Sequence, residues 1–302
     1  MAEPIALPSR PRVPGLGATI ELLKPLTWFA PMWAFGCGVI SSGTAIVERW
    51  PYVIGGILLA GPLVCGTSQA VNDWFDREVD VINEPHRVIP SGRMPGRWGL
   101  AIALASTVLS IAVAFLLGPW VLGAALGGLL LAWAYSAPPF RLKRSGWYGP
   151  AAVGLCYEGL PWFTAAAAAT GAFPGAAVLV TALLYSVGAH GIMTLNDFKS
   201  VRGDRRTGLA SLPATLGIDR AARLACAVMA VPQLVVAGLL VHWGFPVHAA
   251  CVVALLVGQV ACMRRLLRDP LRFAAWYNAT GTTLYVLGML AAAVALRSLG
   301  SA

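Results

Sequence analysis

The chain has 302 residues, of which 58% are hydrophobic and 12% are charged, and its mean hydropathy is +0.71. A soluble domain cannot bury this share of apolar side chains, so the composition predicts an integral membrane protein and excludes a soluble enzyme. The net charge of +9 does not indicate a nucleic-acid partner, because its placement along the chain follows a membrane pattern instead.

The chain begins with a proline-containing stretch that lacks an apolar run of signal-peptide length. We therefore expect residues 1–20 to form a flexible cytoplasmic tail and residues 21–302 to form one transmembrane domain. Apolar segments of membrane-spanning length follow, and they predict an all-α integral membrane fold of nine transmembrane helices. These segments cover residues 26–46, 52–72, 99–117, 119–136, 149–170, 174–195, 221–241, 245–263 and 275–296.

The basic residues are distributed unevenly between the loops. All Lys and Arg residues except Arg49 and Arg297 lie in the N-terminal tail, in the even-numbered loops or in the helix ends beside them. By the positive-inside rule, the N-terminus and the even-numbered loops are cytoplasmic and the C-terminus lies on the opposite side. A count of nine helices fits this alternation, whereas eight or ten would break it.

Two acidic motifs interrupt the apolar background. They are NDWFDREVD at 72–80 and NDFKSVRGD at 196–204, and each begins at the cytoplasmic end of an even-numbered segment. In both, an Asn-Asp pair is followed seven residues later by Asp. The motifs indicate an internal repeat, and their equivalent places in the topology strengthen that interpretation.

Helical spacing predicts how these acids are arranged. Asn72, Asp76 and Asp80 lie at i, i+4 and i+8, so they share one face of a helix. Asp73 and Asp80 share a neighbouring stripe. Asp197 and Asp204 lie two turns apart, provided that their helix continues that far. We expect the two acidic stripes to face each other across a cavity at the cytoplasmic membrane surface.

Clustered carboxylates repel one another unless a cation lies among them, and ligands that are all oxygen favour Mg²⁺ over zinc. Mg²⁺ commonly bridges carboxylates to a phosphorylated substrate. Basic residues near the motifs suit the remaining phosphate oxygens; they are Arg77, Arg141, Lys143, Lys199 and Arg202. Together with an apolar chamber, these groups predict a lipid diphosphate substrate. The alternative is a set of solvated helix ends with ordinary salt bridges and membrane anchors.

The two motifs resemble those of the UbiA superfamily of intramembrane prenyltransferases. Its first motif, NDxxDxxxD, matches residues 72–80 fully, whereas the second copy has Val201 where many members carry an acid. The strings DVINEPHRVIPSG (80–92), YSAPPFRLKRSGW (135–147) and NDFKSVRGDRRTGLASLP (196–213) are similar to the chlorophyll and bacteriochlorophyll synthase branch. YEGLPWF at 157–163 favours the bacteriochlorophyll side. The resemblance extends from about residue 21 to residue 296.

The resemblance implies nine helices around a central cavity that opens laterally to lipid, and Mg²⁺-dependent transfer of a prenyl group from its diphosphate. In this branch a geranylgeranyl or phytyl group esterifies the C17 propionate of (bacterio)chlorophyllide, the last stage of (bacterio)chlorophyll biosynthesis. The implied setting is a bacterial inner or photosynthetic membrane, with the active site at the cytoplasmic face. Membrane lipid and pigment-biosynthesis or photosystem-assembly proteins are the further partners to expect.

On this reading, the catalytic residues come from both motifs. We expect Asn72, Asp76, Asp197 and Asp204 to bind the metal, Asp73, Asp80 and Asn196 to support them, and the five basic residues to bind diphosphate. Each basic residue has an alternative role as a membrane anchor, and Arg77 has Glu78 or Asp73 as an alternative partner. The candidate substrate-pocket residues, each with a structural alternative, are Tyr135, Glu158, Trp162, His190 and His86.

Two other functions remain open. A transporter also uses repeats and intramembrane acids, but its acids would lie near the midplane and its repeats would often be inverted. A UbiA-type enzyme that prenylates a quinone or haem precursor would share the acidic motifs but not the branch strings.

Overall fold

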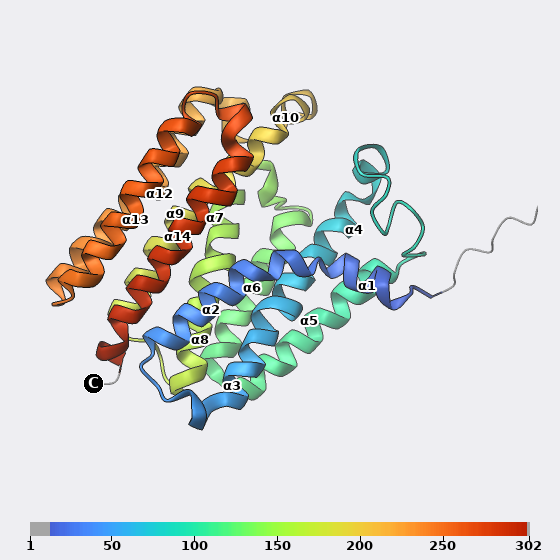
Figure 1. Cartoon of the computed structure of the whole chain (residues 1–302). Helices are drawn as coiled ribbons and strands as arrows, with labels where there is room; N and C mark the ends of the chain where they lie inside the picture. Colours follow the sequence, from blue (N-terminus) through green and yellow to red (C-terminus); the bar gives the residue numbers. More distant parts are fainter. Residues whose placement is uncertain (1–12, 301–302) are drawn as a thin grey trace, which may run out of the picture.

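The computed structural model describes residues 13–300 as a bundle of long helices joined by short connections (Figure 1). In chain order, the helices are α1 (Leu16–Leu23), η1 (Pro25–Trp28), α2 (Phe29–Ser41), α3 (Ile46–Leu58), η2 (Leu59–Cys65), α4 (Gly66–Asn83), α5 (Trp98–Leu117), α6 (Pro119–Ser136), η3 (Leu142–Arg144), α7 (Tyr148–Gly154), η4 (Leu155–Gly159), α8 (Leu160–Thr170), α9 (Ala176–Asn196), η5 (Asp197–Lys199), α10 (Val201–Thr207), α11 (Leu212–Thr215), α12 (Ile218–His242), α13 (Pro246–Leu266) and α14 (Pro270–Gly300).

The fold confirms the expected all-α membrane architecture. Within residues 13–300, seven helices are long and apolar enough to cross a membrane. The other two expected segments are composite: η1 with α2 forms one, and α7, η4 and α8 form the other. The second segment is longer than expected, because α3, η2 and α4 continue as one helix of 38 residues to Asn83. The first acidic motif therefore lies on the polar end of a membrane-spanning helix.

Both long interruptions of regular helix are π-helical and lie beside a proline. Pro62 lies within η2, and Pro161 follows η4 by two residues. A proline lacks the N–H that an α-helix needs, and a π turn absorbs the displaced carbonyl without ending the helix. Cys65 and Tyr157 lie on these two turns, and both line a cavity inside the bundle.

Close helix approach at small residues holds the core together. A Cβ atom at Gly38 on α2 would overlap with the backbone carbonyl of Trp162 and with Ala165, so α2 and α8 pack nearly backbone to backbone. Beside this contact, the indole N–H of the fully buried Trp162 donates to the Ser41 hydroxyl at 2.9 Å. The Trp162 ring also stacks on the ring of Tyr185, with centroids 6.0 Å apart. This packing fixes α8, and with it the preceding α7 and η4, against the rest of the bundle.

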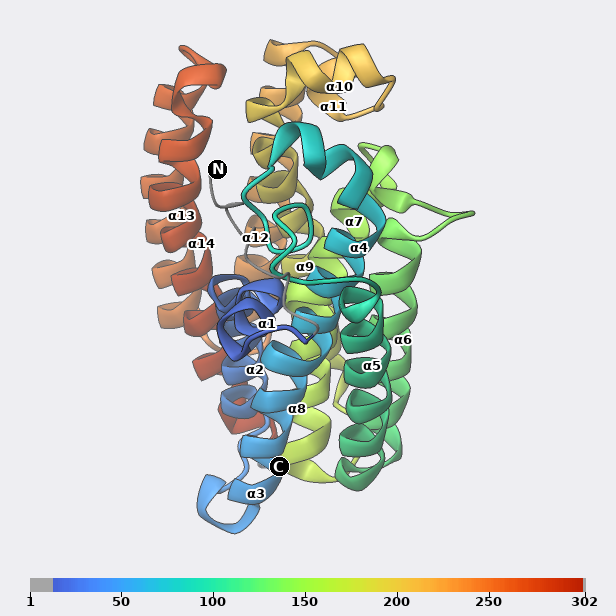
Figure 2. The ribbon, with the colours of Figure 1, turned by 90° about the vertical axis from the view of Figure 1, so that its right-hand side faces the viewer.

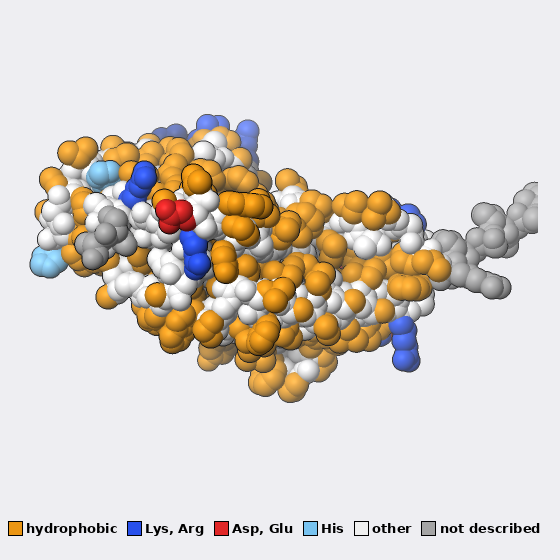
Figure 3. All heavy atoms as spheres, turned by 90° about the horizontal axis from the view of Figure 1, so that it is seen from below, with side chains coloured by type: hydrophobic (Ala, Val, Ile, Leu, Met, Phe, Trp, Pro, Cys, Tyr) orange, Lys and Arg blue, Asp and Glu red, His pale blue; other side chains and the backbone are white. Residues whose placement is uncertain are grey.

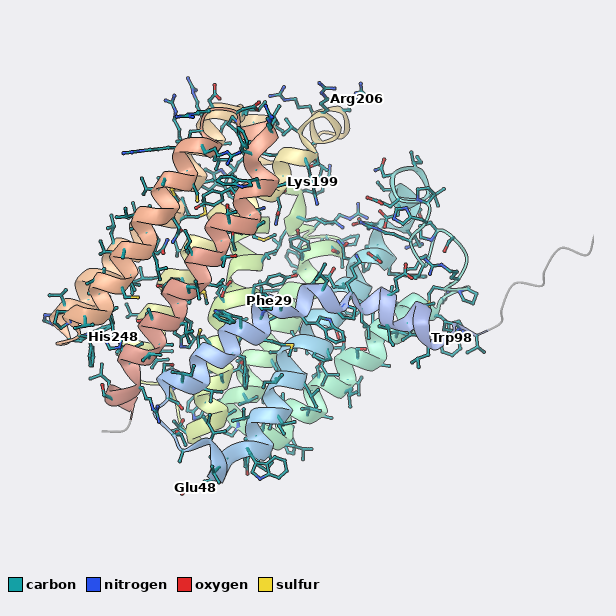
Figure 4. All side chains as sticks on the ribbon, in the orientation of Figure 1. Phe29, Glu48, Trp98, Lys199, Arg206 and His248 are labelled. Atoms are coloured by element: carbon teal, nitrogen blue, oxygen red, sulfur yellow. The ribbon has the colours of Figure 1, made fainter. Side chains whose placement is uncertain are left out.

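The two ends of the bundle differ in charge. The polar end of α4 and the short helices α10 and α11 lie at the same end in two perpendicular views (Figures 1 and 2). Lys199 and Arg206 lie at that end, and Glu48 lies at the opposite end (Figure 4). Viewed from the Glu48 side, the surface is mainly hydrophobic with few charged side chains (Figure 3). The basic loops therefore gather at one end, as the sequence predicted.

The expected tail spans residues 1–20, and its first twelve residues lie outside the described part of the chain. Regular structure already begins at residue 16, because α1 packs onto the bundle. Leu22 is fully buried in a cluster with Ala70 and Val71, and Glu21 forms a two-point ion pair with Arg93. The α1 helix thereby holds the loop that follows α4.

Candidate active site

A cavity of about 270 Å³ lies inside the bundle beneath the acidic end of α4. Its walls come from η1, η2, α4, α6, α7, η4 and α9. Most of the lining is apolar, and its polar side chains are concentrated on α4 and on the facing residues of α6 and η4. The lining residues that enter the argument are Thr27, Cys65, Gln69, Asn72, Tyr135 and Tyr157.

The first motif presents two faces. Asn72 lines the cavity and donates to Ser136 at 3.1 Å, and Asp76 accepts from Lys143 at 2.5 Å. Lys143 also reaches Ser136, at 3.4 Å. A cation therefore already lies among the oxygen atoms of Asp76 and Ser136, directly above the cavity.

The carboxylates on the other face of α4 are buried, and basic side chains balance their negative charge. Asp73 is 2% exposed and accepts from Lys24 at 2.6 Å, while Arg87 lies 2.9 Å from Asp80 and 3.5 Å from Asp73. An unpaired carboxylate at this depth would be strongly destabilising, and each of these two has a basic partner. Asp80 therefore shares Arg87 with Asp73, whereas Asp76 pairs with Lys143. This face ties α1 and the 84–97 loop to the motif.

The second motif does not continue as one helix. The α9 helix ends at Asn196, a 3₁₀ turn carries Asp197, and α10 begins only at Val201. Ser200 separates the two segments, with φ −108° and ψ 1°, outside the helical range. Asp197 and Asp204 therefore lie on separate helical segments. The expected spacing of two turns required one continuous helix, and the break at Ser200 excludes it.

Asp204 instead holds the loop that follows α10 through hydrogen bonds. Its carboxylate is buried and accepts from Ser200 at 3.0 Å and from Ser211 at 2.6 Å. The backbone of Ala210 beside it pairs with the loop after α6, through bonds to Arg144 and Gly146 at 3.1 and 2.8 Å. The loop that carries Lys143 is thereby fixed to the second acidic motif.

The two motifs approach each other around Tyr135. The hydroxyl of Tyr135, on the cavity wall, lies within electrostatic reach of both Asp76 and Asp197. Asn196 accepts from Asn278 at 2.7 Å, and its amide contacts Met193, which also lines the cavity. Asp76 of the first motif and Asp197 of the second thus both lie near Tyr135, and that they serve one site stays a prediction.

Two basic groups on the loop after α6 suit an anion. Arg141 adopts φ 42°, a left-handed conformation that is uncommon for an arginine. Its Nε is buried and has no hydrogen-bond partner among residues 13–300. Burial lowers the pKa of the neighbouring Lys143 from its ordinary value, and the carboxylate of Asp76 opposes that shift. A buried guanidinium nitrogen without an acceptor is a place for phosphate oxygen.

The other three predicted basic residues lie farther out. Arg77 donates to the Trp74 carbonyl at 2.7 Å, stacks over the Trp74 ring and pairs with Glu78 at 3.3 Å. Lys199 and Arg202 are exposed on the second-motif segment, and Lys199 acts electrostatically on Asp197.

Of the predicted substrate-pocket residues, Tyr135 lines the cavity and the others lie elsewhere. Glu158 is 4% exposed on η4, with its Oε2 unpaired within the described chain, and Trp162 is packed into the core. His190 is half-buried beside Trp147, with ring centroids 5.8 Å apart. His86 is exposed beside Glu84 in the loop after α4.

Several side chains that the structure brings to the site were not predicted from the sequence. They are Lys24, Arg87, Ser136 and Gln69. A signal existed for Gln69, because it lies three residues before Asn72 and is therefore on the same helical face. Arg87 follows Asp80 by seven residues, but it lies beyond the end of α4, where helical spacing no longer applies. Lys24 and Ser136 come from segments far from the motif along the chain, so only the fold reveals them. Tyr157, which the sequence offered as an aromatic suited to the macrocycle, does line the cavity.

Comparisons with known proteins agree with this geometry. The model of the UbiA prenyltransferase family matches residues 31–280. The chain is 60% identical over 287 residues to the bacteriochlorophyll synthase 33 kDa chain of Cereibacter sphaeroides, covering 95% of each chain. It is 54% identical to the protein of the same description from Rhodobacter capsulatus, covering 96% of each.

Among solved structures, a UbiA homolog from Archaeoglobus fulgidus bound to GPP and Mg²⁺ is similar with a TM-score of 0.71. The identity is 19%, and the match covers 89% of this chain and 99% of that one, so it shows a shared fold. The sequence match extends over nearly the whole chain, and Asn72 of the first acidic motif lines the cavity. The chain therefore belongs to the UbiA prenyltransferase family.

Proposed function

We propose that this protein transfers a geranylgeranyl or phytyl group from its diphosphate to the C17 propionate of bacteriochlorophyllide, with chlorophyllide as the secondary acceptor. The observation that carries this proposal is a polar, charged rim next to an apolar cavity. The rim is formed by Asn72, Asp76, Ser136 and Lys143. The rim suits a diphosphate and the cavity suits its isoprenoid chain. The 60% identity to a bacteriochlorophyll synthase supports the choice of acceptor.

The rim fits a hard divalent cation in the chemistry of its donors. The carboxylate of Asp76 and the hydroxyl of Ser136 lie beside the Lys143 ammonium, and oxygen ligands of this kind favour Mg²⁺. Asn72, Asp76, Asp197 and Asp204 would hold the ion, and Ser200 and Ser211 orient the last of these. When bound, Mg²⁺ supplies neutralising charge to the departing diphosphate.

The protein's own groups perform the remaining tasks. Arg141 and Lys143 bind diphosphate oxygens and stabilise the negative charge that develops as the C1–O bond breaks. Asp73 and Asp80, paired with Lys24 and Arg87, hold α4 in place without adding net charge to the rim. The apolar wall excludes water from the allylic carbon, so hydrolysis does not compete with transfer.

The acceptor needs no strong base. A propionate is ionised at neutral pH, so its oxygen attacks C1 directly and no proton has to leave. Relatives that alkylate an aromatic carbon must remove a proton. This difference favours the ester-forming reaction over the prenylation of a quinone precursor.

Lys199 and Arg206, on the segment of the second acidic motif, lie at the end of the bundle that carries the basic loops (Figure 4). By the positive-inside rule this end is cytoplasmic, so we place the active site at the cytoplasmic face of a bacterial inner or photosynthetic membrane. Water-soluble diphosphate is then released into the cytoplasm.

The test is ester formation by the purified protein. Bacteriochlorophyllide a and chlorophyllide a are each supplied with geranylgeranyl or phytyl diphosphate, with Mg²⁺ or with a chelator. We expect the prenyl ester by mass spectrometry, its loss on chelation and its recovery when Mg²⁺ is restored. Prenylation of 4-hydroxybenzoate without any tetrapyrrole ester would place the protein in the quinone branch and refute the proposal.

A further inference from the structure

A neutral polar patch lies on the cavity wall, about one helical turn below Asn72 and two turns below Asp76. The Gln69 amide donates to the Tyr157 hydroxyl at 3.3 Å, and the Cys65 thiol approaches the same hydroxyl at 3.9 Å. Cys65 also lies 3.5 Å from the Thr27 hydroxyl. All four side chains line the cavity, and the walls around them are mainly apolar.

This patch has hydrogen-bonding capacity that the described chain uses only weakly. The Tyr157 hydroxyl accepts from Gln69, and the group beside its own proton is the Cys65 sulfur, a weak acceptor 3.9 Å away. The second N–H of the Gln69 amide also lies near that sulfur. A carboxylate oxygen in the cavity is a stronger acceptor than a thiol, so it can take a hydrogen bond from each of these two donors, which come from α4 and η4.

The depth of the patch is set by the helix that carries it. Gln69 precedes Asn72 by three residues, so the two differ in height by about 4.5 Å along α4 and share a face. The diphosphate belongs at the level of Asp76, where Lys143 and Arg141 are found. Gln69 precedes Asp76 by seven residues, so it lies about 10.5 Å below it along α4. A diphosphate bound beside Asp76 would direct its C1 carbon into this interval, and a carboxylate between C1 and the patch would fill the rest of it.

We propose that Gln69 and Tyr157 form the subsite for the attacking carboxylate of the acceptor. This inference rests on the proposed function, because it concerns an acceptor that carries a carboxylate. The two donors bind one carboxylate oxygen and leave the other directed at C1. The new C–O bond forms from that oxygen, the C1–O bond to diphosphate breaks, and its electron pair leaves with the diphosphate.

Neutral donors suit this step better than charged ones. An ionised carboxylate in an apolar cavity needs hydrogen bonds, or its burial is prohibitively costly. A lysine or arginine at this depth would supply them but would also reduce the nucleophilicity of the oxygen and repel the developing allylic cation. An amide and a phenol supply donors without positive charge, and neither removes a proton, which an ester-forming reaction does not require.

The test compares wild type with Gln69→Met and Tyr157→Phe, which remove the donors at nearly constant shape. Tyr148→Phe is the matched control, because Tyr148 is 70% exposed at the start of α7. For each protein we measure the KM for bacteriochlorophyllide and the KM for geranylgeranyl diphosphate. We also measure the affinity for bacteriochlorophyllide and for its C17 methyl ester by pigment fluorescence.

We expect each donor variant to raise the KM for the acceptor by about tenfold or more, the scale of a lost hydrogen bond to a charged group. The KM for the prenyl diphosphate should stay within about twofold, which also shows that the variant is folded. Wild type and Tyr148→Phe should prefer the free carboxylate to its methyl ester, and both donor variants should lose that preference.

The possible failures are distinguishable. If wild type forms the ester and the donor variants keep both the acceptor KM and the preference for the free carboxylate, the inference is overturned and the proposed function stands. If the variants change only the KM for the prenyl diphosphate, the patch serves the donor substrate and the inference is equally overturned. If wild type forms no tetrapyrrole ester at all, the proposed function fails and the inference fails with it.

Discussion

Replacing Lys143 by methionine removes the ammonium that lies above the cavity. In the structure this group donates to Asp76 at 2.5 Å and to Ser136 at 3.4 Å, and its side chain is 18% exposed. Water therefore screens its charge only partly. If it stabilises the departing diphosphate, its removal costs about 2.7–4 kcal/mol, the magnitude seen when one preorganised donor to a transition-state oxyanion is lost. That cost corresponds to a fall of about 100- to 1,000-fold in kcat.

The assay follows ester formation at saturating acceptor and prenyl diphosphate, with Arg144→Met as the control. Arg144 is the next residue on the same 3₁₀ turn, but it is exposed. We expect Arg144→Met to stay within about twofold of wild type, as for an ordinary surface charge. If Lys143→Met also stays within about threefold, Lys143 is a membrane anchor and the diphosphate assignment is wrong.

The remaining predictions concern pH, anion binding and packing. Because burial lowers the pKa of Lys143, its ammonium is lost as pH rises through that lowered value, and the wild-type rate should fall at alkaline pH before an ordinary lysine titrates. Lys143→Arg, which keeps its charge, should retain its rate there, and parallel pH profiles would refute this cause. Arg141→Gln should raise the KM for the prenyl diphosphate by about tenfold or more, measured by initial rates, with the acceptor KM unchanged; an unchanged diphosphate KM would remove Arg141 from the site. Gly38→Ala should destabilise the detergent-solubilised protein by about 1–3 kcal/mol, because its methyl group meets the α8 backbone, whereas Gly36→Ala on the same helix has open space. Equal melting temperatures for the two alanine variants would contradict the close approach of α2 and α8.

Helix periodicity correctly predicted those features that depend on the spacing of residues within one helix. The apolar segments, the charge asymmetry and the shared face of Asn72 and Asp76 all follow from spacing along one helix, and the structure has each of them. Both motifs begin at the same end of the bundle, which agrees with Asp76 and Asp197 both lying near Tyr135.

The break at Ser200 was not predictable from spacing. The acids at 197 and 204 have helical periodicity, but the hydroxyls of Ser200 and Ser211 bind Asp204 and favour a separate α10. Tertiary hydrogen bonds of this kind override local pattern. The partners of Asp73 and Asp80 were hidden for a similar reason, since Lys24 is 49 residues away in the chain from Asp73 and its charge had been assigned to membrane orientation.

The most direct test of the central claim is a double-mutant cycle across the two motifs. Asp76→Asn, Asp197→Asn and the double variant are assayed for tetrapyrrole ester formation in Mg²⁺. If both carboxylates serve one metal–diphosphate site, each single change should reduce kcat at least 100-fold and the double change should cost little more than either alone, since groups that act as a unit are not additive. Activity of either single variant within threefold of wild type, or losses that multiply independently, would contradict a shared site.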